Sequence, residues 1–395
     1  MIVMKCLFVS SLCSDRIIKQ IHESSRKNPG FAGLKFRNLL ARGLKLNCVD
    51  IKALSVIPMS ESLSRKRCWF NKSEDVEGIV YKYVPFINIS GIRQVMIFLY
   101  TFFYVLFWGV SKRKDKFIVC DMLNISLCVA VLWATKINKV RTVGVLTDMP
   151  GMMVSRSGKS GLPLATKINK SYLASFDSYV FLAEAMNEVV NKRNKPYVVI
   201  EGFSNNVLPS QKDKPNNDKF IIMYAGGLHE RYGLKMLADA VEGMINESVE
   251  LHLYGDGPFV EYLKHHNYRK TRYHGILLND DIIQAELDAD LLVNPRPTSE
   301  DFTKYSFPSK NIEYMGSGTP LATTVLPSMP AEYYPYIYLF KDESVNGYRK
   351  VLEEVSNLSK DELRRKGRLA QMYILENKTN AIQVRKILSM IDERL

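Results

Sequence analysis

Short apolar runs alternate with helical patterns along the chain, and this alternation is the strongest constraint on its fold. In the first half, the expected strands are Ile2–Val9, Cys48–Val56, Ile79–Val84, Phe117–Cys120, Thr142–Thr147, Tyr179–Leu182 and Tyr197–Ile200. Helical patterns occur between several of them, at Gly33–Leu40, Ile125–Lys136 and Glu184–Lys192. Strands separated by helices need crossover connections, so the pattern predicts a parallel sheet covered by helices.

The same alternation begins again after a polar, proline-containing segment near residue 205, which is typical of a linker. The strands expected beyond it are Phe220–Ala225, Val249–Tyr254, Tyr273–His274, Asp290–Val293 and Leu321–Val325. Helices are expected at Leu234–Met244, Phe259–His266, Asp280–Leu287 and Ser309–Met315, and in the charged tail from Val345 to Leu395. The sequence therefore predicts an α/β protein with two Rossmann-like domains that face each other across a cleft.

We expect an N-terminal domain at residues 1–204, a linker at 205–218 and a second domain at 219–376. A last helix at 377–395 is expected to pack back toward the first domain. Charge differs between the halves: residues 1–200 carry 30 Lys and Arg against 13 Asp and Glu, and the rest carry 24 against 28. A basic domain attracts anionic lipids or phosphorylated ligands. No nucleic-acid-binding module is recognisable, so nucleic acid is not an expected partner.

All six cysteines lie in the first half, and their spacing matches no zinc site. Scattered single cysteines are typical of a reducing compartment, which predicts a cytoplasmic protein without a metal. The N-terminal apolar run is interrupted by Lys5 and is not followed by a small-residue cleavage site, so a first strand is favoured over a signal peptide.

The stretch Val95–Val110 is almost wholly apolar and is followed by Lys112, Arg113 and Lys114. Its sixteen residues fall short of the roughly 20 that a spanning helix needs. Three interpretations stay open: a buried crossover helix, a helix lying in a membrane interface, and a transmembrane helix. In the second case, Trp108 and the three basic residues would hold this domain to anionic lipid of the inner leaflet.

The segment from Phe307 to Pro320 predicts an anion site at the start of a helix. Ser309 and Lys310 open the helix, where free N–H groups and the positive dipole end suit a diphosphate. Glu313 shares one helix face with Lys310 and can accept hydrogen bonds from ribose hydroxyls. An ordinary surface helix with a proline start and a glycine stop is the alternative.

Three further elements of the second half are expected to border the same ligand. Gly226 and Gly227 end a strand and let backbone approach a ligand closely, and Arg231 follows before the next helix. Gly255 lies in a turn after the next strand, for which a plain tight turn is the alternative. The third is Asn294-Pro295-Arg296-Pro297 after a buried strand. In the first half, Asp148 follows an apolar strand and is our candidate to orient or deprotonate an acceptor hydroxyl, with a turn-capping role as the alternative.

These motifs resemble the nucleotide-binding domain of GT-B-fold glycosyltransferases, in particular the retaining family 4. The resemblance is strongest over about residues 218–330, and the Tyr-Ser-Phe-Pro-Ser-Lys and Glu-Tyr-Met-x-x-Gly-Thr-Pro stretches are similar to a bacterial surface-polysaccharide subgroup. The first half is similar only through Ala32–Phe36 and Val145–Pro150. By this resemblance, Ser309, Lys310, Arg231 and the backbone of Gly226 and Gly227 would meet the donor diphosphate, and Glu313 the ribose.

Two positions depart from the family pattern. Relatives commonly carry two glutamates with seven residues between them, and counting back from Glu313 places Tyr305 at the first position. Tyr305 is therefore grouped with the donor-binding residues. Glu300 or Asp301, in the preceding loop, is our candidate to take the place of the missing glutamate, and we choose Glu300 as the catalytic candidate. Tyr232 stands where many relatives have a lysine, so Arg231 would supply that charge.

The resemblance implies a metal-independent, retaining hexosyltransferase that needs no cofactor beyond its nucleotide-sugar substrate. A UDP-sugar is the favoured donor, and the expected acceptor is a lipid-linked saccharide in O-antigen, capsule or exopolysaccharide assembly. Such an enzyme would sit peripherally on the inner face of the cytoplasmic membrane. A non-catalytic nucleotide-sugar-binding scaffold and a hydrolysing sugar-nucleotide epimerase of similar fold remain alternatives.

Overall fold

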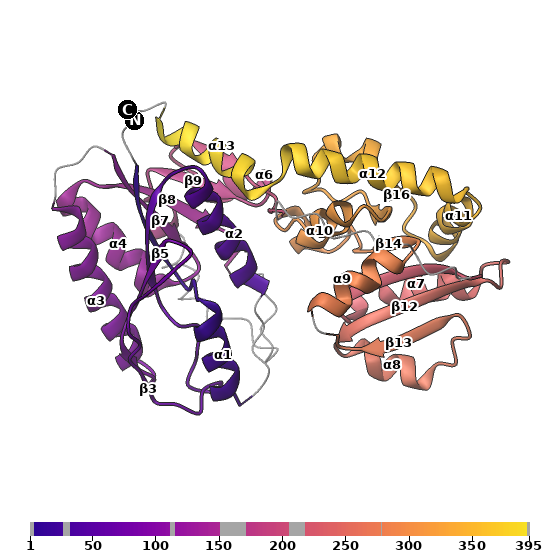
Figure 1. Cartoon of the computed structure of the whole chain (residues 1–395), viewed down its shortest axis with the longest axis horizontal. Helices are drawn as coiled ribbons and strands as arrows, with labels where there is room; N and C mark the ends of the chain where they lie inside the picture. The colour runs from indigo at the N-terminus through magenta and orange to yellow at the C-terminus, as the bar shows by residue number, and fades with distance from the viewer. Residues whose placement is uncertain are drawn as a thin grey trace. The chain divides into compact units, whose positions relative to one another are not determined.

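A computed structural model describes residues 4–26, 32–110, 115–150, 171–204, 218–277 and 279–392. The chain forms two compact units (Figure 1). Unit 1 comprises Met1–Phe203 together with Asn380–Leu395, and unit 2 comprises Ser204–Thr379. Each unit contains a sheet of mostly parallel strands with helices on its faces, which confirms the predicted α/β class.

The sheet of unit 1 has eight strands in the order β10-β9-β8-β7-β1-β2-β5-β4. Their bounds are β1 Lys5–Ser10, β2 Asp50–Ser55, β4 Glu74–Val76, β5 Ile79–Tyr83, β7 Lys116–Asp121, β8 Arg141–Leu146, β9 Ser178–Phe181 and β10 Tyr197–Val199. All neighbours pair in parallel except β4, which runs antiparallel to β5 at the edge. The central strand β1 is buried from Cys6 onward, which explains its continuous apolar run.

Six described helices belong to unit 1: α1 Asp15–Ser24, α2 Ala32–Leu46, α3 Ile92–Gly109, α4 Ile125–Asn138, α6 Glu184–Val190 and α13 Asn380–Asp392. Side-chain caps mark two of their starts, because Ser14 accepts from the Ile17 N–H and Asn124 from the Leu127 N–H. The last helix, α13, packs on α2, where the Asn47 side-chain amide donates to the Ala381 carbonyl at 2.9 Å. A two-stranded ribbon of β3 Cys68–Trp69 and β6 Phe86–Ile87 completes the unit.

The sheet of unit 2 has six parallel strands in the order β13-β12-β11-β14-β15-β16. Their bounds are β11 Phe220–Gly227, β12 Val249–Asp256, β13 Thr271–Gly275, β14 Leu291–Asn294, β15 Leu321–Thr324 and β16 Tyr338–Phe340. The α-helices are α7 Leu234–Glu242, α8 Phe259–His265, α9 Asn279–Asp288, α10 Ser309–Ser317, α11 Val345–Ser356 and α12 Lys360–Asn377. Three 3₁₀ turns lie between them: η1 Glu230–Tyr232, η2 Asp301–Lys304 and η3 Ala331–Tyr336.

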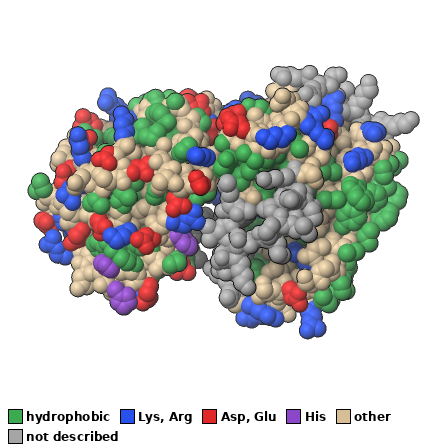
Figure 2. Space-filling view, turned by 180° about the vertical axis from the view of Figure 1, so that it is seen from behind, with side chains coloured by type: hydrophobic (Ala, Val, Ile, Leu, Met, Phe, Trp, Pro, Cys, Tyr) green, Lys and Arg blue, Asp and Glu red, His purple; other side chains and the backbone are tan. Residues whose placement is uncertain are grey.

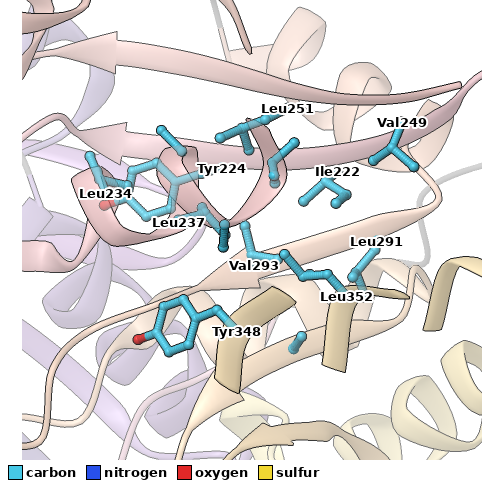
Figure 3. Close-up of a cluster of buried hydrophobic side chains, with 14 of the residues drawn as sticks. Ile222, Tyr224, Leu234, Leu237, Val249, Leu251, Leu291, Val293, Tyr348 and Leu352 are labelled. Carbon is cyan, nitrogen blue, oxygen red and sulfur yellow. The ribbon is translucent and has the colours of Figure 1, made fainter. Parts of the chain in front are cut away.

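One buried cluster joins the sheet of unit 2 to the helices on one of its faces (Figure 3). Tyr224 and Val293 come from neighbouring strands, Leu237 from α7, and Tyr348 and Leu352 from α11. All five are at most 1% exposed. This core holds the ends of β11 and β14 in fixed positions, so the loops that follow those strands start from a rigid base.

The apolar helix α3 is longer than the sequence pattern indicated, and only one side of it is packed. Ile97, Thr101, Val105 and Gly109 recur every four residues and are buried, and the helix packs chiefly on α4. By length and composition α3 is sufficient to cross a membrane, but only 22% of it is buried in the protein. The buried-crossover interpretation is therefore wrong, because Val95, Leu99, Phe103 and Phe107 form an exposed apolar side of the helix.

Candidate functional site

Two strand ends of unit 2 approach each other through glycine backbone. In the register of β11 and β12, Gly226 lies opposite Gly255, and both have positive φ angles of 147° and 126°. A Cβ atom on Gly255 would overlap the carbonyl oxygen of Gly226. Only glycine permits this contact. A simple tight turn needs glycine for its backbone angles alone, whereas Gly255 also needs it because a side chain would overlap the neighbouring strand.

Lys310 reaches this glycine end from α10. Its ammonium occupies the space that a Cβ on Gly226 would need and lies 5.2 Å from the centre of the Tyr224 ring. Pro308 precedes the helix and provides no side-chain cap, and Ser309 is the exposed first residue. The helix start, the lysine and the glycine backbone thus lie together, as the sequence motifs predicted, in an arrangement suited to a diphosphate.

Tyr314 fixes α10 against the sheet. Its buried hydroxyl accepts a hydrogen bond from the Ala225 N–H at 2.9 Å and donates one to the Ala225 carbonyl at 3.2 Å. Burial raises the pKa of Tyr314 well above its usual value, so the hydroxyl stays protonated and keeps both bonds. Glu313, the expected ribose ligand, is half-buried one position earlier and shares a helix face with Lys310.

Arg231 and Glu300 form an ion pair, with Nη2 and Oε2 2.6 Å apart. Their side chains are 34% and 32% exposed, respectively, so solvent and a ligand can still reach them. Arg231 also lies 4.6 Å from the centre of the Phe302 ring. The structure therefore places Glu300, our catalytic candidate, directly against Arg231, our candidate for neutralising phosphate.

The sequence motifs placed the segment that contains Arg296 beside the ligand but gave this residue no role of its own, and the structure puts it in the same cluster. Its guanidinium lies 4.9 Å from the Tyr232 ring centre and 5.7 Å from that of Phe302. Arg231 and Arg296 therefore both lie against the Phe302 ring, from two different segments of the chain. The available signal was a lone cation between two prolines directly after a buried strand.

A buried amide pair was also missed. The Asn294 side-chain amide at the end of β14 donates to the Asn311 side-chain oxygen of α10 at 2.6 Å. Both residues are about 1% exposed, and Asn294 Oδ1 and Asn311 Nδ2 have no other partner among the described residues. The pair ties the loop that carries Arg296 to the helix that carries Lys310.

Removing the carboxylate that holds Arg231 should strengthen anion binding. We expect Glu300→Gln to bind UDP several-fold more tightly than the wild type. In the variant, Arg231 no longer has to give up its ion pair with Glu300 in order to bind the diphosphate. Calorimetric titration of UDP measures this change. An unchanged affinity would show that the diphosphate does not reach Arg231, and a loss of affinity would place Glu300 itself among the ligand's hydrogen-bond partners.

The other predicted residues lie as follows. Tyr305 is half-buried directly after η2. Asp148 is half-buried two residues after β8, in unit 1. Trp108 is half-buried near the end of α3, and the Lys116 ammonium donates to its carbonyl at 2.7 Å. Lys112, Arg113 and Lys114 lie outside the described residues. In the part of the chain that is described, no group of three or more His, Cys, Asp or Glu side chains is placed to hold a metal ion.

Part of unit 2 matches a known protein family. Residues 219–350 match the family model described as Glycosyl transferases group 1. No curated protein sequence matches the chain.

Solved structures match over the whole chain at low identity. Sucrose-phosphate synthase from Thermosynechococcus elongatus is 13% identical, covers 99% of this chain and 100% of its own, and has a TM-score of 0.67. The lipopolysaccharide outer core galactosyltransferase WaaB is 14% identical with the same coverages and a TM-score of 0.60. Anabaena Alr3699/HepE in complex with UDP-glucose is 13% identical, again with the same coverages, and has a TM-score of 0.61. These likenesses confirm the GT-B fold, and the family match falls within unit 2.

Proposed function

We propose that this protein transfers a sugar from a nucleoside-diphosphate donor, with a UDP-sugar favoured, to a saccharide carried on a membrane lipid. The observation that carries the proposal is the Lys310 ammonium lying against the Gly226 backbone at the start of α10. This constellation lies inside the segment 219–350 that matches the group 1 glycosyltransferase model. The solved complex of Alr3699/HepE with UDP-glucose supports the choice of a uridine donor.

The chemistry follows from the charge that develops on the leaving group. As the bond to the anomeric carbon breaks, negative charge grows on the nucleoside diphosphate. Lys310, Arg231 and the N-terminal dipole of α10 would stabilise that charge, so the proposed reaction needs no metal ion. Glu313 would hold the ribose hydroxyls, and the backbone of Gly226, Gly227 and Gly255 would leave room for the donor.

Unit 1 would bind the acceptor. Asp148 follows a buried strand and is our candidate to orient the attacking hydroxyl or to accept its proton. Retention of the anomeric configuration is proposed from the resemblance to family 4. The pathway that we propose is assembly of a bacterial surface polysaccharide such as O-antigen, capsule or exopolysaccharide.

The proposed location is the inner face of the cytoplasmic membrane, with the protein bound peripherally. The outward face of α3 supports this location, because Val95, Leu99, Phe103 and Phe107 are between 46% and 71% exposed. Helices with such a face lie in the membrane interface and are held there by apolar burial and by charge.

Acceptor-dependent release of nucleoside diphosphate tests the proposal. Purified protein is given UDP-sugars and GDP-sugars, with and without a bacterial membrane lipid extract, and each reaction is run both with and without EDTA. We expect UDP release only with the extract, unaffected by EDTA. Release without any acceptor would favour the hydrolysing epimerase, and nucleotide binding with no release under any condition would favour the scaffold.

A further inference from the structure

A basic cavity of about 520 Å³ lies in unit 1, and residues from the first turn of α3 and from the segment before β3 line it. Five cations line it: Arg26, Arg65, Lys66, Arg67 and Arg93. The only acidic residue in its lining is Glu61, whose carboxylate accepts a hydrogen bond from the Ser90 N–H at 3.2 Å. The loops that form the cavity follow the carboxyl ends of β2 and β5, the sheet edge at which ligands bind in open α/β folds.

The backbone holds these cations in place. The Arg26 N–H donates to the Leu63 carbonyl and the Arg65 N–H donates to the Ser24 carbonyl, each at 2.8 Å. Arg67 directly precedes β3, and its carbonyl accepts a hydrogen bond from the Asn88 N–H at 2.6 Å after the partner strand β6. Residues from three separate loops are therefore fixed around one cavity.

Asn88 lines the cavity and lacks side-chain partners. It is 2% exposed, and neither its amide nitrogen nor its side-chain oxygen has a hydrogen-bond partner among the described residues. Arg93 Nε is likewise buried without a partner in that part of the chain. Buried polar atoms are costly to leave unsatisfied, and a ligand with several oxygen acceptors would satisfy the two donors among them, Asn88 Nδ2 and Arg93 Nε.

Glu61 lines the cavity but is not paired with any of these cations among the described residues. Within the described ranges, none of the five forms an ion pair. Burial lowers the pKa of Arg93, but a guanidinium still stays charged at neutral pH. Guanidinium groups recognise phosphate through paired hydrogen bonds, so the cavity fits a phosphate or diphosphate group.

An apolar groove continues along the same helix. A second cavity, of about 500 Å³, is lined by Pro85, Met96, Leu99, Tyr100, Phe103 and Phe107, among others. Figure 2 shows hydrophobic side chains gathered at the right edge of the view, on the side of unit 1 where α3 lies. From Arg93 to Phe107 the helix rises about 21 Å, which exceeds the roughly 15 Å hydrocarbon depth of one leaflet.

We infer that the basic cavity binds the phosphate or diphosphate group of a membrane lipid, and that the groove along α3 receives the start of its hydrocarbon chain. The order of the two cavities along one helix matches the order of charge and hydrocarbon in such a lipid. A nucleic acid or a soluble phosphate would use the basic cavity alone and leave the groove uncovered. The inference rests on the proposed function only for the further step that this lipid carries the acceptor saccharide.

Vesicle flotation of the full-length protein tests the inference. Vesicles of phosphatidylcholine are doped with phosphatidic acid, which exposes a terminal phosphate, or with phosphatidylglycerol at equal surface charge. We expect tighter binding to the phosphatidic acid vesicles. Arg65→Ser/Arg67→Ser should weaken that binding by about tenfold or more and abolish the preference, because each basic side chain near a charged surface contributes separately.

Matched variants separate the cavity from general charge. Arg364→Ser/Arg365→Ser removes two exposed arginines from α12 of unit 2 and should keep the preference. Asn88→Leu should lose the preference at unchanged charge. If this buried variant fails to fold, the variant of the exposed pair Arg65 and Arg67 still tests the cavity. Leu99→Ser/Phe103→Ser should lose binding to both vesicles while still binding inorganic pyrophosphate.

Two results would overturn the inference. The first is equal binding to both vesicle types, or an Arg65/Arg67 variant that behaves like the α12 control. The second is binding of inorganic pyrophosphate with no vesicle binding, which would make this a soluble-anion site. UDP titration of the same samples keeps the proposals distinct. If the wild type prefers phosphatidic acid but does not bind UDP, the donor site of the proposed function fails and the lipid cavity stands.

Discussion

Lys310→Ala is expected to weaken UDP binding by about tenfold or more. Hydrogen bonds to a charged group are worth roughly 1.5–3 kcal/mol, and the variant loses both the charge and the donor. In the wild type the ammonium lies directly against the Gly226 backbone, where the proposed diphosphate would bind. Calorimetric titration of UDP and GDP into both proteins measures the effect and shows which nucleotide is preferred.

Lys304→Ala is the matched control for this experiment. Lys304 is an exposed lysine at the end of η2, a few residues before α10, and its removal changes the net charge equally. It should leave UDP affinity within about twofold. If Lys310→Ala binds UDP as well as the wild type does, the start of α10 is an ordinary surface helix and the donor site lies elsewhere.

Gly255→Ala is expected to destabilise unit 2 by about 2–5 kcal/mol. A positive φ raises the free energy of the folded state for any residue with a Cβ. Here the added Cβ would also overlap the carbonyl of Gly226 on the neighbouring strand. Because the chain has two units, amide hydrogen exchange of β11 and β12 reports the loss more directly than a global melt does. The displaced strand end should also weaken UDP binding.

Gly275→Ala separates the two causes. Gly275 also has a positive φ, of 76°, but nothing lies within 4 Å of the position where its Cβ would be. This variant should lose only the conformational part, about 1 kcal/mol. Equal losses for the two variants would mean that the close approach of Gly255 to Gly226 contributes nothing, and would contradict the packing described for the strand ends.

The long buried strands were predictable from the sequence, whereas several of the short ones were not. Runs such as those of β1 and β11 are apolar on both faces because helices cover the sheets, and that pattern is visible in the sequence alone. The strands β3, β6 and β16 have two or three residues each and carry no period. Helix α1 was missed because its sequence is largely polar.

In the candidate site, local motifs were predictable and contacts between loops were not. The start of α10 is encoded within a few residues, so the position of Lys310 in its helix could be read directly. The pairs Arg231–Glu300 and Asn294–Asn311 join residues 69 and 17 positions apart, and only the packed loops decide which groups meet. Similarly, the composition of α3 could not show which of its faces is covered.

The most direct test of the account follows the transferred sugar itself. A UDP-sugar labelled in the sugar is incubated with the full-length protein and a membrane lipid extract, and label is measured in the organic-solvent fraction. We predict label in a lipid fraction that mild acid releases as a saccharide, formed by the wild type and lost in Lys310→Ala. If all label stays in the donor, or appears only as free sugar in the aqueous phase, the protein does not transfer sugar to a lipid-linked acceptor.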